Sequence, residues 1–317
     1  MKTFIRQIII VIGINTYAQN PIPFDTIYIQ KITATTLHLG QYGRATLQID
    51  DAGDDGFIIK PLIIAEGFDS GILGVENEFG ESDLISFAED IQQSLSLNLQ
   101  NFINGGTIEA TGDQDYDIIY VNWDNGRDYL QRNAFALQEV IKWVNDQKAL
   151  ASSTEKNVVL GQSMGGVIAR YALADMEQRS LPHDTSLYIS HDAPHQGANI
   201  PLGIQYFARH LADQFVGTPM GDYSFEVSDG NSASIEEINA LFNAPGTQQL
   251  LTSYIKSNFQ LDTNSMNDAW QADLLQKGYP TQTRNIAISN GSHCANTQEY
   301  DYNASLFKMS GNIKRVF

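Results

Sequence analysis

Residues 157–170 constrain the fold more than any other stretch of the chain. Their sequence, NVVLGQSMGGVIAR, is typical of a buried apolar strand, a sharp turn and the start of an amphipathic helix. Gly161, Ser163 and Gly165 fit the pattern G-x-S-x-G of a nucleophile elbow, which raises a serine hydroxyl above the carboxyl end of a parallel strand. The bare pattern arises by chance in about one chain in ten, but here the flanking strand and helix supply the context it requires. We therefore interpret Ser163 as the nucleophile of a hydrolase.

Apolar strands and amphipathic helices alternate around this turn. Strand patterns occur at 57–65, 117–121, 157–161, 186–190 and 284–289, and helix patterns at 81–102, 131–147 and 164–178. Such alternation predicts a mostly parallel sheet with right-handed crossovers and helices on both faces, an α/β-hydrolase type of scaffold. We expect one domain over residues 19–317.

The segment before the first buried strand is β-like from Phe24 to Asp50 and predicts an N-terminal β extension. Asp50 to Gly56 is strongly acidic. It lacks the terminal Glu and the flanking helices of an EF-hand, so we interpret it as a solvated hairpin turn.

The alternation of strands and helices stops between about residues 200 and 283, where helix-like pieces occur at 235–242 and 247–259. An insertion at this point of the sheet would lie over the edge where Ser163 emerges. We interpret it as a helical cap or lid that shapes an apolar pocket and excludes water. A packing extension without a gating role is the alternative.

The net charge of the chain limits the classes of partner that it can bind. Among its 317 residues, 37 are acidic and 19 basic, and the formal net charge is −18. Nucleic acid and anionic membrane surfaces both attract positive charge, so neither is an expected partner. We expect a small-molecule or lipid ester as substrate, and the sequence leaves the oligomeric state open.

The first 18 residues are typical of a signal peptide. Lys2 and Arg6 precede a short apolar run from Ile8 to Ile14, and Thr16 and Ala18 are small residues at a cleavage site. The apolar run is shorter than the ~20 residues that span a bilayer. We therefore expect a secreted or periplasmic protein without a stable membrane anchor. A single cysteine excludes an internal disulfide.

A serine nucleophile needs a histidine base. In this fold the base follows the nucleophile and the acid along the chain, which favours His293, the last histidine, directly after a late strand. His195 also lies after a strand at the carboxyl edge. It is the alternative base, or a residue that orients the nucleophile loop. We expect His183 to be solvated, and His38 and His210 to have structural roles.

Asp192 stands at a strand end, where its carboxylate would hold an imidazole in the required tautomer. Asp301, beyond the late strand, is the alternative acid, and a plain salt bridge is a further role for Asp192. The oxyanion of acyl transfer needs two backbone N–H donors. Met164 follows the serine, and Phe68 lies in the loop after an earlier apolar strand, so these two are the predicted donors. No Cys/His cluster or Gly-rich phosphate loop predicts a metal or a cofactor.

The elbow, residues 161–166, together with Pro194-His195-Gln196-Gly197, resembles the lipase/esterase superfamily of α/β-hydrolases and its PGAP1-like group. Residues 60–69 and 290–292 are similar to exported Bacteroidetes members. The resemblance covers about residues 58–292. It implies hydrolysis of carboxylic esters, Ser163 as the nucleophile and no cofactor.

The sequence departs from the superfamily at two places. The usual His-Gly before the oxyanion loop is Glu66-Gly67 here. The chain also ends soon after one late strand, where the superfamily has a further strand that carries its histidine, so we expect the sequence to be C-terminally incomplete. Alternative functions are a non-catalytic hydrolase-like cell-surface module, and a peptidase or thioesterase on the same scaffold.

Overall fold

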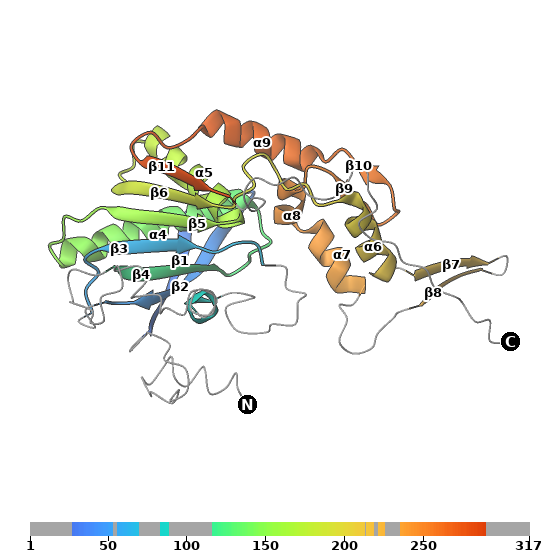
Figure 1. Ribbon diagram of the computed structural model, residues 1–317, viewed down its shortest axis with the longest axis horizontal. Helices are drawn as coiled ribbons and strands as arrows, with labels where there is room; N and C mark the ends of the chain where they lie inside the picture. The colour runs from blue at the N-terminus through green and yellow to red at the C-terminus, as the bar shows by residue number, and fades with distance from the viewer. Residues whose placement is uncertain are drawn as a thin grey trace, which may run out of the picture.

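The computed structural model describes residues 27–52, 56–69, 83–88, 116–212, 214–218, 221–225 and 235–289. This part of the chain contains a seven-stranded sheet in the order β1-β2-β4-β3-β5-β6-β11 (Figure 1). The strands are β1 (Ile27–His38), β2 (Gln41–Asp50), β3 (Pro61–Ala65), β4 (Asp117–Trp123), β5 (Asn157–Gln162), β6 (Thr185–His191) and β11 (Arg284–Ile288). From β4 to β11 neighbouring strands are parallel, whereas β1 and β2 extend one edge antiparallel. Flanked by helices, this sheet has the predicted α/β-hydrolase architecture.

The central strands are buried on both faces, as their unbroken apolar runs predict. Every residue of β3 and β4 is buried. Because strand side chains alternate between faces, Ile63 and Ala65 join the core under the long helices, while Leu62 and Ile64 pack against residues 84–88 on the other face. The helix expected at 81–102 is described only at 84–88, which is helical.

Two helices cover the larger core, α4 (Leu130–Leu150) and α5 (Met164–Gln178). The predicted helix at 164–178 is confirmed residue for residue. The prediction at 131–147 is confirmed too, with its apolar stripe buried: Ala134, Leu137, Val140, Ile141 and Val144.

The acidic segment after β2 is not a solvated hairpin turn. Asp50 and Asp51 are buried, and β4 separates β2 from β3 in the sheet, so the segment joins strands that are not neighbours. Backbone N–H groups in this segment and in the residues that follow it donate to carboxylates, and not to a neighbouring strand. Asp51 accepts a bond from Gly56 N–H, and Asp117 accepts bonds from three more: Ala52, Ile59 and Lys60.

The segment between β6 and β11 holds α6 (Leu202–Ala212), β7 (Gln214–Thr218), β8 (Gly221–Phe225), α7 (Ile235–Asn243), α8 (Pro245–Leu250), β9 (Tyr254–Ile255), β10 (Leu261–Asp262) and α9 (Ser265–Lys277). Figure 1 shows α6, α7 and α8 beyond the carboxyl ends of the parallel strands. In contrast, α9 packs on α5, where Trp270 stacks on Tyr171 with ring centroids 5.3 Å apart. The gating role predicted for this segment stays a prediction.

The helix expected at 247–259 is wrong beyond Leu250. Helix α8 starts early, because Pro245 is suited to the first helical position. It ends early because its last carbonyls are taken by side-chain amides: Asn264 Nδ2 donates to the carbonyl of Gln248, and Asn267 Nδ2 to that of Gln249. No helix in the described part of the chain combines the length and apolar character of a membrane span. The predicted signal peptide, residues 1–18, lies outside the described residues.

Candidate active site

Ser163 stands at the apex of a strained turn between β5 and α5. Its backbone torsions are φ 50° and ψ −120°, a conformation that residues other than glycine rarely adopt. Ser163 N–H donates to the carbonyl of His191 at 2.8 Å, which ties the turn to the end of β6. Ser163 is half-buried, and its hydroxyl neither caps α5 nor makes a hydrogen bond to the described residues. It is therefore held in place by its backbone and available to a ligand.

Three glycines make the turn possible. A Cβ on Gly161 would lie 2.4 Å from Gly166 Cα, and one on Gly165 would lie 2.2 Å from the carbonyl oxygen of Ala65. A Cβ on Gly166 would lie 2.6 Å from Ala193 Cβ. Side chains at these positions would push α5 away from the sheet, so the glycines of the pattern are required by close packing.

The loop after β3 lies beside Ser163, where the oxyanion-binding loop of a nucleophile elbow would belong. A Cβ on Gly67 would lie 3.4 Å from Ser163 Cβ and 4.0 Å from Ser163 Oγ. Phe68, the next residue, packs against the core, and Met164 is fully buried at the start of α5. The N-terminus of a helix carries a partial positive charge that favours a developing anion. The structure thus brings Phe68 and Met164, the predicted donors, to the neighbourhood of Ser163.

Glu66, which stands where the sequence resemblance predicts a histidine, connects β3 to β4 through hydrogen bonds. Its side chain is buried, and its Oε1 accepts the backbone N–H of Trp123 at 2.5 Å. The Glu66 carbonyl also accepts a bond from Trp123 Nε1 at 3.3 Å. Two hydrogen bonds thus hold the start of the loop beside Ser163.

Asp192, the predicted acid, lies at the junction of β5, β6 and β11. Its N–H donates to the carbonyl of Ile288 at 2.7 Å, and its φ is 48°. The preceding residue, His191, accepts the bond from Ser163 N–H. Asp192 is therefore adjacent to the residue that accepts the bond from Ser163 N–H, and it is exposed at the carboxyl ends of the strands.

His195 bonds to Ser190 rather than to Ser163. Its Nε2 lies 2.8 Å from Ser190 Oγ, and its Nδ1 is buried without a partner among the described residues. Burial, together with the nearby Arg170 guanidinium, lowers the pKa of His195 to about 4. The imidazole is thus neutral at physiological pH. Tyr279 contacts both groups: Arg170 lies 3.8 Å from its ring centroid, and the His195 ring 5.7 Å.

The other histidines considered as bases lie away from Ser163 or outside the described residues. The prediction that His183 is solvated is wrong: it is buried, its Nδ1 accepts the N–H of Thr185, and its Nε2 pairs with Glu177 at 3.3 Å. His38, the last residue of β1, packs on the ring of Tyr129. His210 lies in α6. His293 and Asp301 lie outside the described residues.

Sequence reasoning missed three neighbours of this site, Ser190, Arg170 and Tyr279. Ser190 interrupts an apolar strand, and Arg170 interrupts the apolar face of α5. A polar residue in such a place is expected to have a specific partner, and this is the local signal that could have identified both. Tyr279 is distant in sequence and carries no such signal. Among the described residues, no three His, Cys, Asp or Glu side chains could hold a metal ion.

Comparison with known proteins identifies distant structural likenesses. Neither a protein-family model nor a curated protein sequence matches the chain. An esterase from Rhizomucor miehei is 12% identical, covering 91% of this chain and 82% of its own, with a TM-score of 0.40. Brefeldin A esterase, described as a bacterial homologue of human hormone-sensitive lipase, is 11% identical over 92% of this chain and 76% of its own, with a TM-score of 0.39. An esterase from Pyrobaculum calidifontis is 11% identical over 91% and 81%, with a TM-score of 0.38. Likenesses this distant carry no information about activity.

Proposed function

We propose that the protein is a serine hydrolase that cleaves carboxylic esters through an acyl-enzyme on Ser163. The geometry of the elbow carries the proposal. The strained backbone of Ser163, its partial burial and its place at the start of α5 are what a serine needs in order to attack a carbonyl.

In this mechanism Ser163 Oγ attacks the ester carbonyl while a histidine takes its proton. The N–H groups of Phe68 and Met164 then stabilise the oxyanion. The histidine returns the proton to the leaving alcohol, and water hydrolyses the acyl-enzyme by the reverse sequence. The loop contact between Gly67 and Ser163 supports the assignment of the two donors.

We assign the base to His293 and the orienting acid to Asp192. Ser289 follows β11 at the carboxyl edge, and β11 is separated from β5 by β6 alone. The four residue steps from Ser289 to His293 can span up to about 14 Å when extended, whereas two strand spacings measure roughly 10 Å. A histidine at position 293 is therefore within reach of Ser163. The contact of His195 with Ser190 favours a positioning role for His195.

The segment that holds α6, α7 and α8 is proposed to cap the substrate site. Its place beyond the carboxyl ends of the strands supports this role (Figure 1). The substrate would be a small-molecule or lipid ester, and the signal-like segment at residues 1–18 supports export. The likeness to PGAP1-like and exported Bacteroidetes proteins remains a sequence prediction.

A non-catalytic hydrolase-like module is the second candidate. Two observations favour it: Ser163 Oγ makes no hydrogen bond to the described residues, and His195 is engaged by Ser190. A module of this kind would keep the elbow and would have no hydrolytic activity that depends on Ser163.

The two candidates separate in an assay with p-nitrophenyl esters of increasing acyl length, run beside a p-nitroanilide and a thioester. We expect the esters to be the preferred substrates, and Ser163→Ala to lower kcat on the order of 10⁴-fold or more. Ser186→Ala, an exposed change on β6, is the matched control and should leave kcat unchanged. Ester cleavage that survives Ser163→Ala, or no cleavage of any substrate by the wild-type protein, would contradict the proposal.

A further inference from the structure

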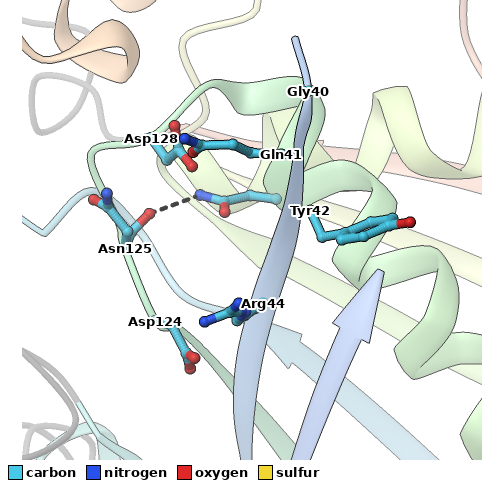
Figure 2. A pocket seen from close by; sticks show the side chains of 8 residues that line it. Gly40, Gln41, Tyr42, Arg44, Asp124, Asn125 and Asp128 are labelled. Atoms are coloured by element: carbon cyan, nitrogen blue, oxygen red, sulfur yellow. Dashed lines mark hydrogen bonds between the residues drawn. The ribbon is translucent and has the colours of Figure 1, made fainter. Parts of the chain in front are cut away.

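A polar pocket of about 550 Å³ opens at the carboxyl end of β4 (Figure 2). The turn between β1 and β2, strand β2, the loop after β4 and the first turn of α4 form its walls. The polar side chains that line it are Gln41, Arg44, Asp124, Asn125, Asp128 and Asn133. In Figure 2, Tyr42 points to the opposite side of β2 from Asn125. None of the candidate catalytic residues lines this pocket.

The walls of the pocket are fixed before any ligand arrives. Arg132 Nε donates to the carbonyl of His38 at 3.0 Å, and Arg132 Nη1 pairs with Asp128 at 2.6 Å, so one side chain joins the hairpin turn to the loop. Asn133 Nδ2 donates to the carbonyl of Asn125 at 3.2 Å. A Cβ on Gly43 would lie 1.9 Å from the carbonyl oxygen of Arg132, so β2 lies directly against α4. The backbone that surrounds the pocket is therefore pre-formed, as in most ligand sites, while the exposed side chains on it can adjust to a ligand.

The lining side chains keep hydrogen-bonding capacity in both directions. The Gln41 amide and the Arg44 guanidinium have no partner among the described residues. Asp124 Oδ1 accepts a bond from Thr46 Oγ1 at 2.9 Å, which leaves its second oxygen open. The pocket thus offers N–H donors beside carboxylate and amide acceptors.

This mixture selects the class of ligand. An apolar group would leave polar side chains unpaired, at a cost in free energy. An anion would meet the carboxylates of Asp124 and Asp128, and a simple cation would meet Arg44. A neutral polyhydroxylated ligand suits the pocket, because each hydroxyl both donates and accepts.

The pocket and Ser163 both lie at the carboxyl ends of the parallel strands. Only β3 separates β4 from β5, so the ends of the two strands lie roughly 10 Å apart. The loop that borders the pocket also touches the loop beside the nucleophile, since a Cβ on Gly126 would lie 2.5 Å from Asp69 Cβ. A ligand in the pocket can therefore belong to the same molecule as a group at Ser163.

We propose that this pocket binds the neutral sugar part of a substrate whose acyl ester reaches Ser163. The inference rests on the proposed ester hydrolysis for its link to catalysis, and on the pocket alone for saccharide binding.

Binding is tested in the full-length Ser163→Ala protein by calorimetric titration with three neutral disaccharides: cellobiose, maltose and xylobiose. We expect saturable binding of at least one in the millimolar range. Cellobionate, which replaces one ring of cellobiose by an open-chain carboxylate, should bind more weakly than cellobiose. Adding Arg44→Ala or Asp124→Asn should weaken binding about tenfold, the effect of losing one hydrogen bond to a charged group. Arg284→Ala, an exposed arginine on the opposite edge of the sheet, is the matched control and should leave binding unchanged.

No binding of any of the three disaccharides, or binding that survives both pocket variants, would overturn the proposal. Kinetic measurements with the active protein test the sugar site separately from the proposed ester hydrolysis. Arg44→Ala should raise KM for acetylated xylobiose about tenfold and leave kcat/KM for p-nitrophenyl acetate unchanged. Cleavage of p-nitrophenyl acetate that depends on Ser163, without saccharide binding, would sink the sugar site alone. Saccharide binding without any hydrolysis would sink the catalytic link and the proposed function.

Discussion

His195 Nε2 lies 2.8 Å from Ser190 Oγ, beneath the first turn of α5, the helix that follows Ser163. Ser190 Oγ would lie 3.2 Å from a Cβ on Gly166, so the serine packs directly under that turn. The imidazole thereby links the loop after β6 to the elbow. In the proposed mechanism this contact gives His195 a positioning role, because its imidazole bonds to Ser190 and not to Ser163.

This burial predicts that His195 makes stability depend on pH. Its pKa in the folded protein, about 4, lies below the ordinary value of 6.5, so the unfolded chain binds the proton first. The contribution of the neutral imidazole is fully present above pH 6.5 and is lost as pH falls towards 4. We expect the stability difference between wild type and His195→Gln in urea unfolding to shrink over this range. A difference that is constant or grows on acidification would contradict the assignment.

The close packing of the elbow predicts opposite effects of two glycine substitutions. Gly165→Ala forces a methyl group into the carbonyl of Ala65 and should destabilise the fold by about 1–3 kcal/mol. Gly203→Ala in α6 meets nothing within 4 Å and should stabilise by up to about 1 kcal/mol, because alanine favours helix. Thermal unfolding of both variants checks the pair. Equal effects of the two substitutions would show that the elbow is not packed as described.

Glu177 should also make stability depend on pH, here through an acidic group that is charged in the folded protein. Its carboxylate accepts bonds from the backbone N–H groups of Thr281 and Gln282, and it pairs with His183. Burial alone would raise the pKa of Glu177, but these hydrogen bonds outweigh it and hold the pKa below 4.5. The stabilisation is therefore present above pH 4.5 and is lost as pH falls through the folded value.

Glu177→Gln should accordingly cost about 1.5–3 kcal/mol at neutral pH, the range for hydrogen bonds to a charged group. The gap to wild type should narrow below about pH 4.5. Glu155→Gln, an exposed glutamate, is the control and should change little. A gap that persists undiminished in acid would show that the carboxylate charge is not what matters.

Local patterns were enough to predict the scaffold. The glycine spacing and apolar stripe of residues 161–178 led to the elbow and to the bounds of α5. The buried runs of β3 and β4 likewise revealed the parallel sheet. These features depend on residues close together in the chain, where side-chain periodicity is informative.

Features set by long-range partners could not be predicted in this way. His183 lies in a polar loop, and its hydrogen bonds to the nearby Glu177 and Thr185, which accompany its burial, follow no periodic pattern. The early end of α8 depends on Asn264 and Asn267, which follow it by more than ten residues. The pairing of His195 with Ser190 and the pocket at the end of β4 also arise from packing that no local pattern records.

Covalent labelling of Ser163 tests the central claim most directly. The full-length folded protein is treated with a fluorophosphonate, which reacts only with an activated serine, and the modified peptide is located by mass spectrometry. We predict stoichiometric labelling of Ser163, absent after denaturation and absent in Ser163→Ala. A folded wild-type protein that takes up no label, or takes it up at another serine, would contradict the account.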